Sequence, residues 1–163
     1  MAHPYDESPV ETPSAVARAA GLLQEQVSRI TANWVLRVGN IPAFRAIPDL
    51  SLSQVQDSIP QLLDAALSAM ATSDPTIDPE SLQRAIDLAA EHGRKRANAG
   101  FMIGVVLAEF QLLRQEVWSA LWRIVDADPL LAEAPRELQS RLSHTFDSLM
   151  IAAAESWAEA RLS

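Results

Sequence analysis

Apolar residues recur at steps of three and four along most of this sequence, and that spacing places them on one face of an α-helix. The segments that show it are residues 14–38, 51–70, 79–98, 101–125 and 135–163. No segment shows the sustained alternation of apolar and polar residues that is typical of a β-strand. Because the links between the segments are short, the pattern predicts an all-α fold, an up-down antiparallel bundle of about five helices.

Capping residues indicate where some of these helices begin. Ser51 and Ser53 are alternative N-caps of the second helix, because a glutamine follows each of them three residues later. Asp78 precedes Pro79, and an acidic N-cap before a proline at the first helical position is a start signal for the third helix. Residues 41–50 contain two prolines and are expected to form an extended connector.

The third and fourth predicted helices carry the packing on which the bundle depends. The fourth is apolar on more than one side, so we interpret it as the central helix. The inward stripe of the third helix shrinks from large to small residues towards its end. Another backbone must therefore approach closely there, and we expect Gly93, Ala97 and Gly100 to allow close packing of these two helices.

The helical domain is expected to comprise residues 13–163. Residues 1–12 form a polar, acidic leader that has almost nothing to bury, and such a segment is expected to be disordered. The last helix reaches Ser163 without a glycine or proline stop, so it either continues into a downstream domain or frays at a native terminus. We expect the first, with this domain as the N-terminal part of a longer signalling protein.

Composition and charge exclude several classes of protein. With 48% hydrophobic and 21% charged residues among 163, the chain is near the globular average and can form a core. A net charge of -8 repels nucleic acid and anionic lipid, and no apolar run approaches the roughly 20 residues that cross a bilayer. The absence of cysteine fits a reducing compartment. We therefore expect a cytoplasmic protein that binds neither nucleic acid nor membrane.

The sequence contains no recognisable catalytic or metal-binding motif. Its only histidines are His3, His92 and His144, and none has a second ligand at the helical spacing that a metal site needs. The residues after His144 differ from the phosphoacceptor box of histidine kinases, and neither GxSxG nor a phosphate-binding loop occurs. We expect no catalytic residue, no metal and no cofactor. A globin-like haem sensor that uses His92 is a third hypothesis, beside the sensory domain and the scaffold considered below.

Helical spacing predicts how several charged residues pair. Glu109 and Glu116 lie seven residues apart on one helix face, and Arg123 follows after seven more, so we expect these acids to pair with it. Lys95 lies four residues after Glu91 and is expected to pair with it on a solvated face.

The candidates for ligand or partner binding lie on the third and fourth helices. Arg96 and Arg114 lie beside small or apolar residues, and a partly buried arginine must find an acceptor, from the protein or from a ligand. Trp118 either packs in the core or lines a pocket or a dimer face. The full set of candidates is His92, Arg96, Glu109, Arg114 and Trp118.

One segment of these helices resembles a known family. It comprises His92-Gly93-Arg94-Lys95-Arg96, Gly100-Phe101, Val105, Glu109-Phe110, Leu112-Leu113-Arg114 and Val117-Trp118. The pattern HGxxRxxxGF…V…EFxLLRxxVW resembles the RsbRD N-terminal domain family, whose members precede other domains in RsbT co-antagonists of the stress pathway and in sensor histidine kinases. The resemblance is tight over about 27 residues and loose over residues 15–160.

The resemblance implies an all-helical, non-catalytic input domain that senses or binds something and passes its state along the last helix. The partners that it implies are a second copy of the chain, a downstream effector domain or regulatory protein, and an unknown small ligand. The alternative is a stand-alone helical scaffold for protein–protein interaction. A pocket lined by Arg96, Glu109 or Arg114 would favour sensing, whereas a solid core with an exposed apolar patch would favour docking.

Overall fold

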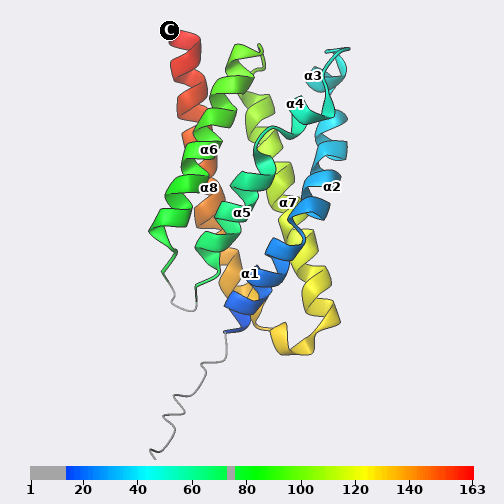
Figure 1. Ribbon diagram of the computed structural model, residues 1–163, viewed down its shortest axis with the longest axis vertical. Coiled ribbons are helices and arrows are strands. Elements are labelled where there is room, and N and C mark those ends of the chain that lie inside the picture. Colours follow the sequence, from blue (N-terminus) through cyan, green and yellow to red (C-terminus); the bar gives the residue numbers. More distant parts are fainter. Residues whose placement is uncertain (1–13, 73–75) are drawn as a thin grey trace, which may run out of the picture.

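The apolar stripes fold as helices that alternate in direction along the chain (Figure 1). A computed structural model describes residues 14–72 and 76–163, and over these ranges it contains no strand. The predicted leader, residues 1–12, lies outside the described residues. The elements are α1 Ala15–Glu25, α2 Val27–Gly39, α3 Pro42–Arg45, α4 Leu52–Gln56, α5 Ile59–Met70, α6 Pro79–Asn98, α7 Ile103–Ala127, the 3₁₀ turn η1 Pro129–Leu131 and α8 Ala134–Leu162.

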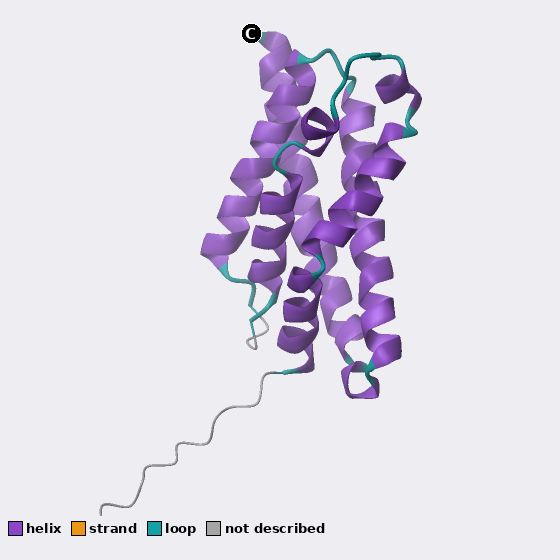
Figure 2. Ribbon diagram, turned by 45° about the vertical axis from the view of Figure 1, so that its right-hand side comes forward, coloured by secondary structure: helices purple, strands orange, loops and turns teal. Residues whose placement is uncertain are grey.

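The predicted fold class is confirmed. Helices α1 and α2 together form the first arm of the bundle, and α5, α6, α7 and α8 form the others, with short links at both ends (Figure 2). The buried apolar side chains form one core that includes residues from all of these helices. None of the helices within the described residues carries an apolar stretch that is long enough to cross a lipid bilayer.

Two of the predicted helices are broken in the structure. The first is interrupted at Gln26, between α1 and α2, and the second at Asp57, between α4 and α5. The second break has a clear cause, because Pro60 has no N–H to donate to the carbonyl four residues before it. The chain instead starts a new helix with Pro60 in its first turn.

The ends of the short helices follow the capping residues closely. Of the two alternative N-caps, Ser51 is the one used, and it forms a complete capping box with Gln54. The segment predicted as an extended connector contains a turn of helix, α3, which begins at Pro42. Phe44 of this turn is buried, and α3 therefore closes one end of the bundle.

The packing of α6 differs from the prediction. We expected it to face α7, but α6 lies mainly between α5 and α8, and it contacts α7 at few positions. The backbones of α6 and α8 approach closely at Gly93, because a Cβ built on this residue would overlap the carbonyl group of Ala153. Gly93 is therefore required by a close backbone approach, as expected, but the neighbour is α8.

Ala97 and Gly100 have different roles from each other. Ala97 is buried on α6, one turn beyond Gly93. Gly100 does not contribute to close packing, because a Cβ built there would meet no atom within 4 Å. Its φ of +90° lies in the region that favours glycine, so this residue serves the turn between α6 and α7.

We expect Gly93→Ala to destabilise the domain by about 1–3 kcal/mol, because the added methyl overlaps a backbone atom that cannot rotate away. Gly21→Ala is the matched control, since Gly21 lies within α1 with open space around it and should gain about 0.5–1 kcal/mol from better helix propensity. Urea unfolding followed by circular dichroism measures both changes. Equal effects of the two substitutions would contradict the close contact.

Candidate functional site

Four charged or titratable side chains meet inside the upper half of the bundle, and we call Asp57, His92, Arg96 and Glu109 the buried charge cluster. His92 lies between the two carboxylates, with Nδ1 3.0 Å from Asp57 Oδ2 and Nε2 3.2 Å from Glu109 Oε2. Arg96 donates from Nε to both oxygens of Glu109 at 3.1 Å and from Nη2 to Oε1 at 2.8 Å. His92, Arg96 and Glu109 are at most 4% exposed. The cluster is therefore a desolvated network of ion pairs.

Local structure explains how these residues come together. His92 and Arg96 are one helical turn apart, so they share a face of α6, and Glu109 approaches that face from α7. Asp57 lies in the break between α4 and α5 with a φ of +47°. A non-glycine residue pays a steric cost there, and such strain persists only where the surroundings hold the residue firmly. Here the carboxylate is held by His92 and by Lys95 Nζ at 2.8 Å.

The remaining donors of Arg96 bind the end of α4. Its Nη1 donates to the carbonyl of Gln54 at 3.1 Å and its Nη2 to that of Val55 at 2.8 Å. These carbonyls belong to the last turn of α4, which has no partners of its own within the helix. The guanidinium also lies near the rings of Phe44 and Phe101, 5.2 and 5.6 Å from their centroids. Arg96 thus joins α3, α4, α6 and α7.

The charge state of His92 follows from its two neighbours. Both ring nitrogens face carboxylate oxygens, and only the protonated ring can donate from both nitrogens at once. Burial disfavours the charged form, but the hydrogen bonds to Asp57 and Glu109 outweigh burial and raise the pKa of His92 above 6.5. The hydrogen bond from His92 holds the pKa of Asp57 well below its usual range. Burial acts to raise the pKa of Glu109, but His92 and Arg96 outweigh burial and lower it.

Two of the predicted ion pairs are wrong. Glu109 and Glu116 do not pair with Arg123: Glu109 binds His92 and Arg96, and Glu116 accepts from Arg37 Nη1 at 3.1 Å.

Lys95 likewise pairs with Asp57 rather than with Glu91, whose carboxylate binds Arg94. Of the four residues in the buried charge cluster, Asp57 was not among the sequence candidates. Pro60, three residues after Asp57, was the feature of the sequence that could have identified it. A proline at this position predicts a break in the helix, and the break changes the direction of the Asp57 side chain.

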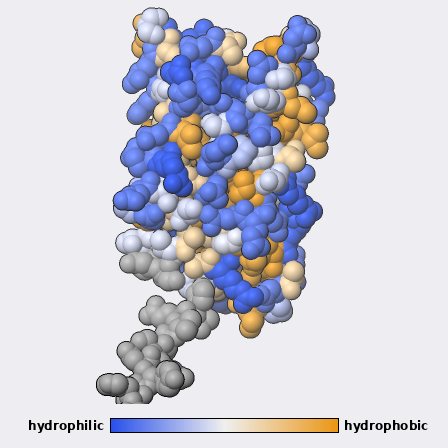
Figure 3. All heavy atoms as spheres, viewed as in Figure 1, coloured by the Kyte–Doolittle hydropathy of each residue, from blue (hydrophilic) through white to orange (hydrophobic). Residues whose placement is uncertain are grey.

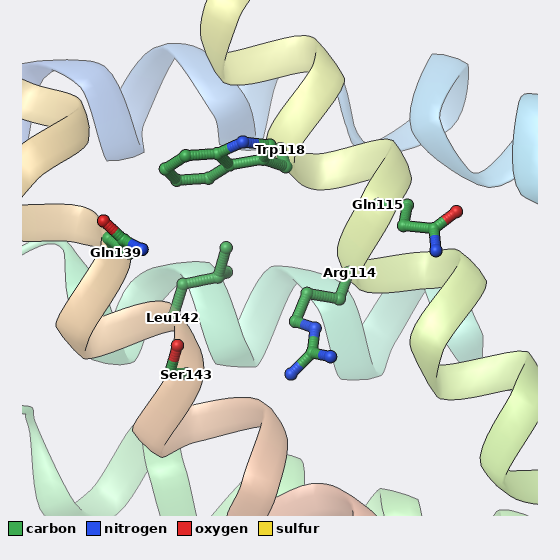
Figure 4. Close-up of a pocket in the computed structure, with 6 residues that line it drawn as sticks. All are labelled: Arg114, Gln115, Trp118, Gln139, Leu142 and Ser143. Carbon is green, nitrogen blue, oxygen red and sulfur yellow. The ribbon is translucent and has the colours of Figure 1, made fainter.

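A second group of candidates lies outside the cluster, in a cleft between α7 and α8 that we call the α7–α8 cleft. It has a volume of about 250 Å³, and its lining residues are Arg114, Gln115, Trp118, Gln139, Leu142 and Ser143. Arg114 and Trp118 project from α7 towards α8, where Leu142 and Ser143 face them (Figure 4). Sequence candidates Arg114 and Trp118 are thus neighbours, and both lie apart from the buried charge cluster.

A hollow of about 340 Å³ lies next to the buried charge cluster, and it is lined by Leu50, Ser53, Gln54, Asp57, Lys95, Arg96, Ala99 and Phe101. The charges on its wall are already paired, since Asp57 binds His92 and Lys95, and Arg96 binds Glu109. A ligand in this hollow would have to break an existing ion pair. It is therefore a weaker binding candidate than the α7–α8 cleft.

Within the described parts of the chain, the side chains of the buried charge cluster hold the helices together and are not arranged for a reaction. The acids of the buried charge cluster are neutralised by His92, Lys95 and Arg96, so neither is available as a free base or nucleophile. No group of three or more His, Asp or Glu side chains in residues 14–72 and 76–163 has a geometry that could hold a metal ion.

The described residues form an all-α bundle that is held by buried ion pairs and has a cleft beside its last helix, and such a fold does not by itself define a function. The chain belongs to the family described as the RsbT co-antagonist protein rsbRD N-terminal domain, whose profile matches residues 28–163. The resemblance inferred from the HGxxRxxxGF and EFxLLRxxVW segments is thereby confirmed. No curated protein and no solved structure gave a significant match. The family consists of regulatory N-terminal domains of stress-response signalling proteins.

We expect the free energy of unfolding to fall as the pH rises above about 6.5 and His92 loses its proton. The folded-state pKa of His92 is raised, so its stabilising effect is complete below the unfolded pKa and is lost as the pH passes the folded pKa. Urea unfolding between pH 6 and about 9 measures this slope. His92→Gln should remove it, whereas His144→Gln, which changes an exposed histidine on α8, should preserve it. An unchanged slope in His92→Gln would contradict the assignment.

We expect Glu109→Gln to cost about 3–5 kcal/mol of stability, because it leaves Arg96 and His92 buried without their shared anion. The matched control is Glu91→Gln, which removes a carboxylate of the same helix pair at the surface, where its partner Arg94 is solvated. Chemical unfolding should show a large loss for the first variant and little change for the second. Similar midpoints for both variants would argue against a stabilising role of the cluster.

Proposed function

We propose that this chain is a non-catalytic sensory and regulatory domain of a bacterial signal-transduction protein, and that it relays ligand or partner binding through α8. Membership of a regulatory family supports the first part. The second part rests on one observation, the position of the α7–α8 cleft. It lies between α7, which the buried charge cluster anchors, and α8, which has no residue in that cluster.

Helix α7 belongs to the anchored part of the molecule. Glu109 ties it to α6 through Arg96 and His92, and the indole N–H of Trp34 donates to the backbone carbonyl of Glu109 at 2.8 Å, which adds α2. Arg37 of α2 binds Glu116 further along the same helix. Breaking a buried ion pair is costly, so α2, α6 and α7 form a rigid frame.

Helix α8 is held near its two ends by hydrogen bonds from side chains to backbone carbonyls. Near its beginning, Arg141 donates to the carbonyls of Met70 and Thr72 at 3.0 and 2.7 Å. Near its end, the indole N–H of Trp157 donates to the carbonyl of Phe101 at 2.8 Å. Between these points α8 buries Phe146 and Leu149 in the core and passes Gly93 at backbone distance. Packed helices of this kind can shift by about 1–2 Å between two states.

The cleft is placed to drive such a shift. Its α8 residues, Gln139, Leu142 and Ser143, lie on either side of Arg141 in sequence, so an occupant would press on α8 close to its anchor. A small tilt there becomes a larger displacement towards the far end of the helix. A ligand that prefers the tilted arrangement would shift the population of the two states by its difference in affinity.

The proposal also covers the compartment, the oligomeric state and the effector of the domain. We propose that the domain works in the cytoplasm as a homodimer and that its effector is a sensor histidine kinase region or a stress-response regulator, in the same polypeptide or in a partner. In a dimer, displacement of α8 in both copies would change the separation of whatever the helices are joined to.

The second candidate function is a helical scaffold for protein–protein interaction. Large hydrophobic side chains are exposed on several elements: Leu36, Leu52, Met102, Trp122, Leu130, Ile151 and Leu162. Polar residues cover most of the face shown in Figure 3, and hydrophobic residues appear there as several patches. Because the exposed residues are spread over α2, α4, α7, η1 and α8, they favour docking less strongly than the cleft favours sensing.

We expect occupancy of the cleft to displace the end of α8 relative to α6. Ser143→Phe places a ring in the cleft as a stand-in for a ligand, and the absence of native cysteine allows specific spin labels at Asn98→Cys and Glu159→Cys. Electron–electron distance measurements should show a shift of about 1–2 Å or more in the α6–α8 distance.

The control for this experiment is a label pair at Asn98 and Gln111, which are exposed on α6 and α7. Its distance should not change, because the buried charge cluster joins these two helices. If Ser143→Phe leaves both distances unchanged, the relay through α8 is wrong and the scaffold function becomes the better explanation.

A further inference from the structure

The guanidinium of Arg114 is only weakly paired among the described residues. Among the described residues it forms no hydrogen bond, and its nearest acid is Asp147, with Nη1 and Oδ1 4.0 Å apart. Asp147 is 67% exposed at its side chain, so water can replace it at little cost. Arg114 is a planar cation with five N–H donors, and it lies half-buried at the cleft with its donors available to a ligand.

Nearby acceptors are already bound by another arginine. Arg37 of α2 donates from Nη2 to the side-chain oxygen of Gln115 at 2.8 Å and from Nη1 to Glu116 at 3.1 Å. The α7–α8 cleft has no carboxylate in its lining, although the chain carries 21 acidic residues. The lining of the cleft thus carries one cation, Arg114, and the nearest carboxylate, that of Asp147, lies outside the lining.

The other wall of the cleft is apolar. The indole of Trp118 extends across the cleft towards α8 and lies over Leu142, which is buried (Figure 4). Trp118 also packs edge-to-face on Trp122, with ring centroids 5.9 Å apart, which restrains its orientation. This wall suits a flat apolar body next to the charged group bound by Arg114.

Two polar side chains of α8 complete the lining. Ser143 and Gln139 each bring a donor and an acceptor to the cleft, and neither forms a hydrogen bond with another described residue. They can bind the edge of a ligand that Arg114 holds by its anionic end. The volume of about 250 Å³ limits such a ligand to roughly one ring with its substituents.

We propose that the α7–α8 cleft binds a small organic carboxylate with a planar apolar body. The carboxylate forms paired hydrogen bonds with Arg114, and the body lies between Trp118 and Leu142. A carboxylate matches a single guanidinium in charge and geometry. Phosphate groups fit less well, because the lining provides no second cation to balance their extra charge. This proposal rests on the sensory function and names the class of ligand that the sensor would take.

The test uses the full chain and benzoate as the probe. Saturable binding should appear by calorimetry, and in a nitrogen–proton correlation spectrum the indole signal of Trp118 should move more than those of the other tryptophans. Benzamide has the same ring without the charge, and acetate has the charge without the ring. Each should bind at least about tenfold more weakly, which corresponds to about 1.4 kcal/mol.

Variants locate the site. Arg114→Gln and Trp118→Leu should each weaken benzoate binding about tenfold or more. Arg123→Gln is the matched control, because it removes an exposed arginine of the same helix that does not line the cleft. Circular dichroism of each variant establishes that the bundle remains folded, and Arg114 is exposed enough for the substitution to be tolerated.

The possible results distinguish a failure of the carboxylate proposal from a failure of the relay through α8. Absence of saturable benzoate binding, equal binding by Arg114→Gln, or preference for inorganic phosphate would overturn the carboxylate proposal. If Ser143→Phe still displaces α8, the sensory function survives that result. If benzoate binds through Arg114 but leaves the α6–α8 distance unchanged, the ligand class stands and the relay fails.

Discussion

The carboxylate of Glu109 is the group on which the rest of the structure depends. It is 1% exposed, and it accepts hydrogen bonds from Arg96 and lies against the ring of His92. A lone buried carboxylate would be far too costly, so the sequence must supply cations that are also fully hydrogen-bonded. Arg96 meets that condition by binding the end of α4, and His92 by binding Asp57. One buried charge therefore ties together α4, α6 and α7, and through His92 it also holds Asp57 at the break that Pro60 causes before α5.

This constraint also explains why α6 packs on α8. Because the side of α6 that faces α7 carries charged residues, the two helices meet through ion pairs and contact each other at few positions. The small residues of α6 are then free for a different neighbour, and Gly93 lets the backbone of α8 approach. The molecule thus combines a network of buried ion pairs on one side of α6 with a close backbone contact at Gly93 on the side that meets α8. Such a combination suits a domain in which one helix changes position relative to a stable frame.

Helix periodicity predicted the long helices well, and it failed where contacts reach across the chain. The bounds of α6, α7 and α8 follow from apolar stripes, from Asp78-Pro79 and from Gly100, all of which act locally. The break at Gln26 was missed because the apolar stripe continues through it, and Pro60 indicated only a small kink where the structure has a break at Asp57. The ion pairs of Glu109 and Lys95 were wrong for a related reason: spacing within one helix cannot show a partner on another, such as Asp57, 38 residues from Lys95. Arg96 and Arg114 became candidates because a partly buried arginine must find an acceptor. The structure places Arg96 in the buried charge cluster and Arg114 in the α7–α8 cleft.

The buried charge cluster and the α7–α8 cleft are separate sites, and this separation determines how a signal would be carried. All three guanidinium nitrogens of Arg96 donate to protein acceptors, so its contribution is to hold the frame, whereas Arg114 at the boundary between α7 and α8 has only the long ion pair with Asp147 among the described residues. A ligand bound at Arg114 need not break the buried charge cluster, and its binding energy can go into moving α8 alone. A tenfold difference in affinity between two positions of α8 corresponds to about 1.4 kcal/mol, which is less than breaking a buried ion pair costs. The frame should therefore stay intact while α8 responds, and this difference in energy is what would confine the conformational change to one helix.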